Sequence, residues 1–317
     1  MSLSVELPFF HRLEPARVVL LAGAGGGADL FAALPLYFAL RTAGKEVRLA
    51  SLSFATVFDS TARVLAPALA EVSADTKTGA RYFPELQLAR WLRTQGEDDT
   101  VYCFDRVGAA PIAEAYRVVA ERVKPDAVVL VDGGTDILMR GDEAGLGTPE
   151  EDAASLAAVH ALDVPTKLIL CVGFGIDTFH GVCHAHFLEA VAALARDGDY
   201  LGAWSLVGGM DEARRYREAV EYAFGGASRQ PSIVNSSILD AVTGEFGNHH
   251  ATSRTHGSEL FINPLMGLYW GFDLDAVARR NLYLHLIRDT RTHFDLRLAI
   301  ERYRLAAPVR PWTSLPM

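Results

Sequence analysis

The chain has 317 residues and is 50% hydrophobic, so it is long enough to bury a sizeable core. Its 30 Lys and Arg against 39 Asp and Glu give a net charge of −9, which excludes a global basic surface for nucleic acid. The three cysteines are too few and too scattered for a disulfide framework. The chain has no polybasic stretch, no signal-peptide pattern and no apolar span of about 18 residues, so we expect a cytoplasmic protein with no membrane partner.

Strand-like and helical stretches alternate along the first two thirds of the chain. Apolar runs predict strands at 17–22, 46–54, 101–104, 128–131, 167–172 and 200–206. Helical patterns lie between them at 30–42, 84–93, 112–123, 150–160 and 184–196, and Pro35 should kink or restart the first of these helices. The alternation predicts an α/β fold with a doubly wound, mostly parallel, Rossmann-like sheet.

The pattern changes after about residue 208. A charged helix is predicted at 211–224, then a break at 225–231, a helix at 236–242, a polar loop at 244–258 and a strand at 259–262. We expect one α/β domain over 1–317, with a core at about 15–207 and a C-terminal elaboration at about 208–317. Helix faces such as 211–224 can support a homo-oligomer.

A glycine-rich loop follows the first predicted strand. Gly23, Gly25 and Ala28 match the G-x-G-x-x-G/A spacing, which favours binding of an anion or a nucleotide by backbone N–H groups. The ligand-binding candidates here are Gly23, Gly25, Gly26, Gly27 and Asp29. The alternative is a tight strand–helix turn in which Asp29 caps the helix. An ordinary NAD site is disfavoured, because no acid ends the second strand to hold a ribose.

An acidic loop follows the strand at 128–131. Its carboxylates can hold Mg²⁺ or Mn²⁺ through oxygen ligands, and the candidate ligands are Asp132, Asp136, Asp142 and Glu143. Asp132 and Asp136 come first at the strand end, so they are also the candidate acid/base groups, and Gly133 and Gly134 can let a ligand approach. The alternative is a solvated turn. Thr148 is predicted to cap the next helix, with Pro149 in its first turn.

Two later loops contribute weaker candidates. His180 follows the strand at 167–172 and is a catalytic candidate, and a zinc site of Asp177, His180 and His184 is conceivable. Ordinary polar histidines are the alternative reading. Arg254, in the polar loop, can clamp an anionic substrate group, or it can belong to a flexible surface loop.

Two stretches together resemble a family of archaeal and bacterial proteins of unknown function. One is the loop 23–29, with the sequence GAGGGAD, and the other runs from 131 to 143, followed by Gly147, Thr148, Pro149 and Asp152. The resemblance covers about the first 200 residues and implies an α/β fold with one site built from both loops. It implies no activity, because that family has none established.

These observations favour a metal-assisted lyase or hydrolase that acts on a small anionic metabolite. Asp132 and Asp136 would hold the metal or exchange protons, and the glycine loop would bind the anion. One alternative is a nucleotide- or metabolite-binding module without catalysis. Another is an NAD(P)-dependent oxidoreductase, which the glycine spacing permits.

Overall fold

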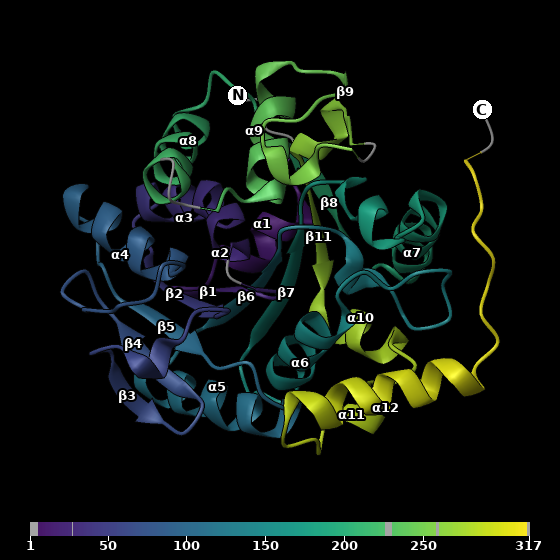
Figure 1. Cartoon of the computed structure of the whole chain (residues 1–317), viewed down its shortest axis with the longest axis horizontal. Helices are drawn as coiled ribbons and strands as arrows, with labels where there is room; N and C mark the ends of the chain where they lie inside the picture. The colour runs from purple at the N-terminus through teal and green to yellow at the C-terminus, as the bar shows by residue number, and fades with distance from the viewer. Residues whose placement is uncertain (1–5, 27, 226–229, 258–259, 316–317) are drawn as a thin grey trace.

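The computed structural model describes residues 6–26, 28–225, 230–257 and 260–315. A nine-stranded sheet forms the middle layer of the molecule, and helices cover both of its faces (Figure 1). The strands are β1 (Val18–Gly23), β2 (Glu46–Leu52), β3 (Arg63–Ala66), β4 (Leu69–Val72), β5 (Val101–Phe104), β6 (Ala127–Asp132), β7 (Thr166–Cys171), β8 (Tyr200–Ser205) and β11 (Leu268–Asp273), with a separate hairpin of β9 (Gly247–Asn248) and β10 (Phe261–Ile262).

The helices fall into two groups, one on each face of the sheet, as the two apolar clusters and Figure 1 show. On one face lie α1 (Pro8–Leu13), α2 (Asp29–Ala32), α3 (Leu34–Thr42), α4 (Pro84–Thr94), α8 (Asp211–Phe224) and α9 (Ile233–Thr243). On the other lie α5 (Ala109–Val123), α6 (Pro149–His160), α7 (His184–Asp197), α10 (Leu274–Arg280), α11 (Leu284–Ile287) and α12 (His293–Ala306).

The central strands are buried on both sides, which explains their continuous apolar sequences. In β6, Val129 and Val131 pack into the first cluster, whereas Val128 and Leu130 pack into the second. Alternate residues of one strand therefore contribute to two cores, and this three-layer arrangement fixes the position of the strand ends.

The sheet has a parallel centre with antiparallel edges. Its order is β3-β4-β5-β2-β1-β6-β7-β11-β8, and the five strands from β5 to β7 run parallel. The hairpin β3–β4 adds antiparallel strands at one edge, and β11 runs antiparallel to both β7 and β8 at the other. The predicted α/β, doubly wound and mostly parallel Rossmann-like fold is confirmed.

The strand order reverses between β1 and β6. The chain moves outward from β1 through β2 to β5, then returns to pair β6 with the other side of β1. In open α/β sheets, the crevice at such a reversal, outside the carboxyl ends of the strands, is the usual place for a ligand. The fold thus directs attention to the loops that follow β1 and β6.

The later part of the chain enters the sheet. Strand β11 lies between β7 and β8, although it follows residue 208. Gly271 makes this possible, since a Cβ there would collide with the Phe9 ring of α1. The division into a core at about 15–207 and an elaboration at about 208–317 stays a prediction. Strand β11 belongs to the second of these segments and is nevertheless part of the central sheet.

Other predicted elements need small corrections. The helix predicted at 30–42 is two helices, and this break agrees with the predicted restart at Pro35, because the chain breaks at Ala33 and Pro35 lies in the first turn of α3. In the strand predicted at 259–262, residue 259 is outside the described ranges and β10 covers the rest only in part. Within those ranges, no helix combines the length and the apolar character needed to span a membrane.

Candidate metal centre

A cavity of about 230 Å³ opens where β1 and β6 end, at the reversal of strand order. Its wall combines the glycine loop, the acidic loop, the first turn of α6, the loop after β7 and the segment that precedes α9. The candidates predicted from the sequence that line it are Gly25, Gly26, Asp29, Asp132, Gly133, Asp136, His180 and Arg254. The fold therefore brings predicted candidates from four separate stretches of sequence to one cavity.

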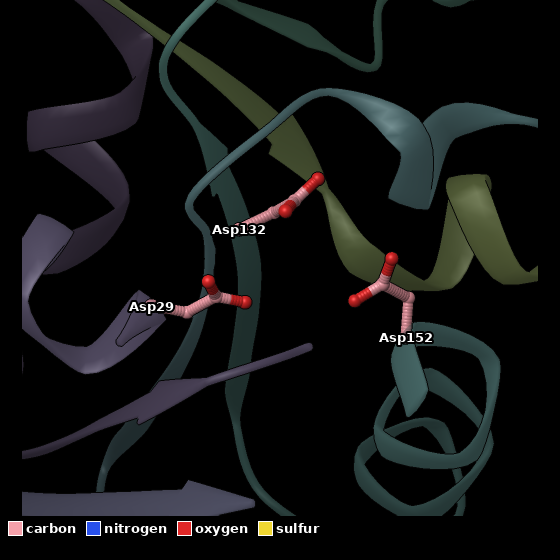
Figure 2. A group of neighbouring side chains, drawn as sticks. All are labelled: Asp29, Asp132 and Asp152. Atoms are coloured by element: carbon pink, nitrogen blue, oxygen red, sulfur yellow. The ribbon is translucent and has the colours of Figure 1, made fainter. Parts of the chain in front are cut away.

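Three aspartates meet in this cavity. Asp29 begins α2, Asp132 ends β6, and Asp152 lies in the first turn of α6. Each offers a carboxylate oxygen, and the three oxygens lie within 4.8 Å of one another. Figure 2 shows the carboxylates directed into a common space from three different elements. Among the described residues, no other group of acids, histidines and cysteines has such spacing.

Asp29 accepts hydrogen bonds from backbone N–H groups of the glycine loop that were expected to bind an external anion. The amides of Gly25 and Gly26 donate to its Oδ2, at 2.8 and 3.2 Å. Asp29 is not the helix cap that the turn hypothesis predicted, since the cap residue is Ala28 and Asp29 is the first helical residue. The contact weighs against binding of a phosphate by these two amides, because a carboxylate already occupies their donor side.

Burial dominates the acidity of Asp29. Burial and then the negative charge of Asp136 raise the pKa of this carboxyl, the amides of Gly25, Gly26 and Gly133 lower it, and the result is a pKa of about 7. A carboxyl with such a pKa is half-protonated near neutrality. A cation would shift it fully to the ionised form.

The absence of a side chain at the loop glycines leaves space for the carboxylates. A Cβ at Gly25 would lie 2.8 Å from Asp152 Oδ1 and closer still to Asp29, and a Cβ at Gly133 would lie 2.8 Å from Asp29 Oδ1. Gly23 acts differently, because a Cβ there would lie 2.9 Å from the backbone of α2. Gly27 is outside the described residues. The loop glycines thus allow close approach of aspartates, as glycines do wherever backbone must meet another group.

Asp132 and Asp152 are the most buried members of the site. Their side chains are 2% and 3% exposed. Asp132 Oδ2 accepts the Ile137 amide at 3.2 Å, whereas Asp152 Oδ2 has no hydrogen-bond partner in the part of the chain that the structure describes. Burial, and then neighbouring aspartates, raise the pKa of both carboxyls well above the usual value. An unpartnered buried carboxylate is costly, and here it lies at metal spacing from two other aspartates, an arrangement that suits a cation.

Two further aspartates complete the wall, each held by a threonine. Asp136 Oδ2 accepts the amide and the hydroxyl of Thr148, at 2.6 and 3.0 Å. Asp177 Oδ2 accepts the amide and the hydroxyl of Thr135, at 2.6 and 3.2 Å. Burial first, and then the charge of Asp136, raise the pKa of Asp177. Thr148 occupies the cap position of α6 as predicted, but its hydroxyl bonds to Asp136 instead of capping the helix.

Two of the predicted metal ligands lie elsewhere. Asp142 pairs with Arg140 at 2.5 Å and with Arg310 at 2.9 Å, and Glu143 accepts the amides of Arg140 and Gly141. Neither residue lines the cavity. These acids hold the acidic loop and the C-terminal segment in place, and neither belongs to the group of carboxylates at metal spacing, so their prediction as metal ligands is corrected here.

The histidines and Arg254 lie toward the outside of the cavity. His180 is exposed and lines the cavity, whereas His184 packs against Phe174 and lies 3.4 Å from the Thr178 hydroxyl. The conceivable zinc site is not formed among the described residues. Arg254 is exposed, and its Nη1 donates to the Pro231 carbonyl at 2.8 Å.

Comparison with known proteins places the chain in a family. The sequence model of DUF1152, described as a protein of unknown function, matches residues 20–306. The chain belongs to the DUF1152 family. This confirms the resemblance to a family of unknown function, and the match spans every aspartate of the site. No curated protein and no solved structure matches the chain.

In this DUF1152 protein, the sequence analysis named Asp152 only within the family resemblance and did not include it among the candidate site residues. It follows Glu150 and Glu151 in a helix start, where acids are expected to complement the helix dipole, so it carried no separate signal. Its burial in the folded chain distinguishes it from an ordinary acid at a solvated helix start, which should be exposed. Phe54 and Tyr82 also line the cavity and were not singled out.

Proposed function

We propose that the cavity binds a divalent cation, Mg²⁺ or Mn²⁺, between Asp29, Asp132 and Asp152, and that the protein is a metal-assisted hydrolase or lyase of a small metabolite. The observation that carries the proposal is the meeting of three carboxylates within 4.8 Å, one of which is buried with an unpartnered oxygen. Hard divalent cations prefer such oxygen ligands.

The charge around the cavity supports a cation. Burial is the largest cause of the raised pKa of Asp29, Asp132 and Asp152, and the charge of Asp136 comes second for all three. Like charges packed this closely cannot all be ionised without compensation. A divalent ion would compensate them and would bind most tightly where the carboxylates are already gathered.

The geometry leaves room for a substrate beside the cation. Three protein ligands would leave open coordination positions for water and for a substrate oxygen, which is the requirement for metal-assisted hydrolysis or elimination. The expected anionic group would contact the cation and Arg254, because the Gly25 and Gly26 amides already bind Asp29. His180, exposed at the cavity, is the group placed to exchange protons with solvent.

A turnover assay tests this proposal. Metal-stripped protein is incubated with a defined panel of carboxylated and phosphorylated metabolites, with Mg²⁺ or with EDTA, and consumption is followed by mass spectrometry. We expect consumption of one compound class to need Mg²⁺ and to be lost in Asp132→Asn. Glu85→Gln is the matched control, since Glu85 is also a fully buried acid but lies outside the cavity.

Two results would reject the proposal. Consumption that is unchanged by EDTA and by Asp132→Asn would place the chemistry elsewhere. Tight binding of a nucleotide without metal and without turnover would instead indicate the binding module considered above.

A further inference from the structure

The Asp136–Asp177 pair forms a second acidic feature beside the three metal-site aspartates. Both residues line the same cavity, and both are more than nine-tenths buried, with 6% and 7% of their surface exposed. Their Oδ2 atoms are saturated by Thr148 and Thr135, which each donate an amide and a hydroxyl. This anchoring fixes the direction of both carboxylates.

Both carboxylates lie close to Gly134. A Cβ built at Gly134 would lie 3.1 Å from Asp136 Oδ1 and 2.8 Å from each of the two Asp177 oxygens. Over the described ranges, neither Oδ1 atom accepts a hydrogen bond from the protein. Each of these two cavity-lining aspartates therefore keeps one carboxylate oxygen that a donor group of a ligand can reach.

A second metal ion fits this pair poorly. Within the described chain, three ligand atoms at metal spacing occur together only in Asp29, Asp132 and Asp152. One divalent ion there would still leave six acidic side chains, five aspartates and Glu151, against two positive charges, because the Arg254 guanidinium is exposed and bonds to a backbone carbonyl. The remaining charge favours a positively charged group that can donate several hydrogen bonds.

We propose that Asp136 and Asp177 bind the protonated amino group of the substrate, so that the substrate class is a small metabolite with both an anionic group and a primary ammonium group. The inference rests on the proposed metal-assisted function and extends it. The anionic group would reach the cation and Arg254, while the ammonium group would donate to the two Oδ1 atoms beside Gly134.

Paired probes test the inference on the whole chain loaded with Mn²⁺. Glycine, alanine, serine and glutamate are compared with glycolate, lactate, glycerate and 2-hydroxyglutarate, which replace the amino group by a hydroxyl on the same carbon skeleton. Binding is measured by calorimetry at neutral pH. We expect at least one amino compound to bind roughly tenfold or more tightly than its hydroxy partner, as for a charged hydrogen bond.

Variants separate this inference from the metal site. Asp177→Asn keeps an oxygen that can accept from Thr135 but presents an amide to the ligand, so it should abolish the preference for the amino compound while Mn²⁺ still binds. Asp136→Asn provides the same test if Asp177→Asn does not fold. Glu85→Gln should keep the preference.

The outcomes are distinct for the two proposals. Mn²⁺ binding with equal affinity for both members of every pair, or with no amino compound bound, overturns the inference and leaves the metal site intact. Absence of Mn²⁺ binding overturns the proposed function itself. A preference that survives in both aspartate variants also overturns the inference.

Discussion

At the scale of single residues, the carboxyl of Asp152 is the clearest sign of a functional site. It is buried among other aspartates, and its Oδ2 has no partner in the described structure. Each unsatisfied buried polar group costs about 1–3 kcal/mol. Glu85 also has a buried unpartnered oxygen, but Asp152 differs from it in lining the cavity at metal spacing from two other aspartates. The protein carries a local instability that a bound cation would remove.

A variant of this residue separates stability from binding. In EDTA at about pH 8, Asp152→Asn should be more stable than the wild type by about 1 kcal/mol, because it removes a buried like charge. The same variant should bind Mn²⁺ more weakly. Urea unfolding, monitored by circular dichroism, measures the first effect, and a loss of stability in EDTA would show that the carboxylate has a structural partner.

The raised pKa of Asp29 predicts a pH dependence for the metal-free protein. Its folded-state pKa of about 7 lies above the ordinary value of 3.8, so its stabilising contribution is complete below about pH 4 and is lost as the pH rises through 7. Asp132 and Asp177 shift in the same direction. The free energy of unfolding should therefore fall between about pH 5 and about pH 8.

Saturating Mn²⁺ should flatten this fall, since the cation stabilises the ionised carboxylates. Thermal unfolding at a series of pH values, with EDTA or with Mn²⁺, measures both curves. The fall should also be shallower in Asp152→Asn than in the wild type, because burial raises the pKa of the Asp152 carboxyl as well. Identical curves with and without Mn²⁺ would contradict the account.

At the scale of elements, helix α12 holds the acidic loop after β6. Arg304 donates to the carbonyls of Gly141 and Glu143 at 2.9 and 2.7 Å, and to that of Ala144 at 3.3 Å. These carbonyls belong to the loop that connects β6 to α6, which carries Asp132 and Asp136 on one side and Asp152 on the other. The geometry of the cavity thus depends on a helix that lies far along the chain.

Replacing this arginine should destabilise the fold. Arg304→Ala leaves three carbonyls without their donor, and we expect a loss of about 1–3 kcal/mol in the free energy of unfolding. Arg302→Ala, on the same helix but exposed, is the control and should change stability by less than about 0.5 kcal/mol. Urea denaturation compares the two, and equal effects would show that Arg304 acts only as a surface charge.

The elements also show how far the sequence predicts this fold. Strand β5 and helix α8 begin and end where their patterns predict, because an apolar run and an amphipathic repeat are local signals. Strand β11 was missed because Gly271 interrupts its pattern, and the reason for that glycine is contact with Phe9, more than 200 residues away in the chain. The edge hairpin β3–β4 was missed because its strands are short.

For the candidate site too, local sequence signals were predictive and long-range contacts were not. Asp29, Asp132 and Asp136 were identified because each follows a strand, and parallel strands end at one edge of the sheet. The sequence could not show that Asp29 accepts the loop amides, or that Asp142 and Glu143 pair with arginines, because these contacts depend on side-chain directions. Asp152 was hidden by an ordinary explanation for acids at a helix start.

At the scale of the whole molecule, the reversal of strand order and the acidic cavity coincide. The fold places the ends of β1 and β6 side by side. The loops that follow these strands bring aspartates to the same space, and α6 adds Asp152 (Figures 1 and 2). This coincidence is the basis for treating the cavity as the functional centre of the protein. Cation binding should stabilise the entire fold, by about 2.7 kcal/mol at 100 times its dissociation constant.

Calorimetric titration of metal-stripped protein with Mn²⁺ tests the central claim most directly. The account predicts one cation per chain in the wild type and in Glu85→Gln, and binding at least roughly tenfold weaker, about 1.4 kcal/mol, in Asp132→Asn and Asp152→Asn. Equal Mn²⁺ affinity in the wild type and in both aspartate variants, or no binding to any of these proteins, would contradict it.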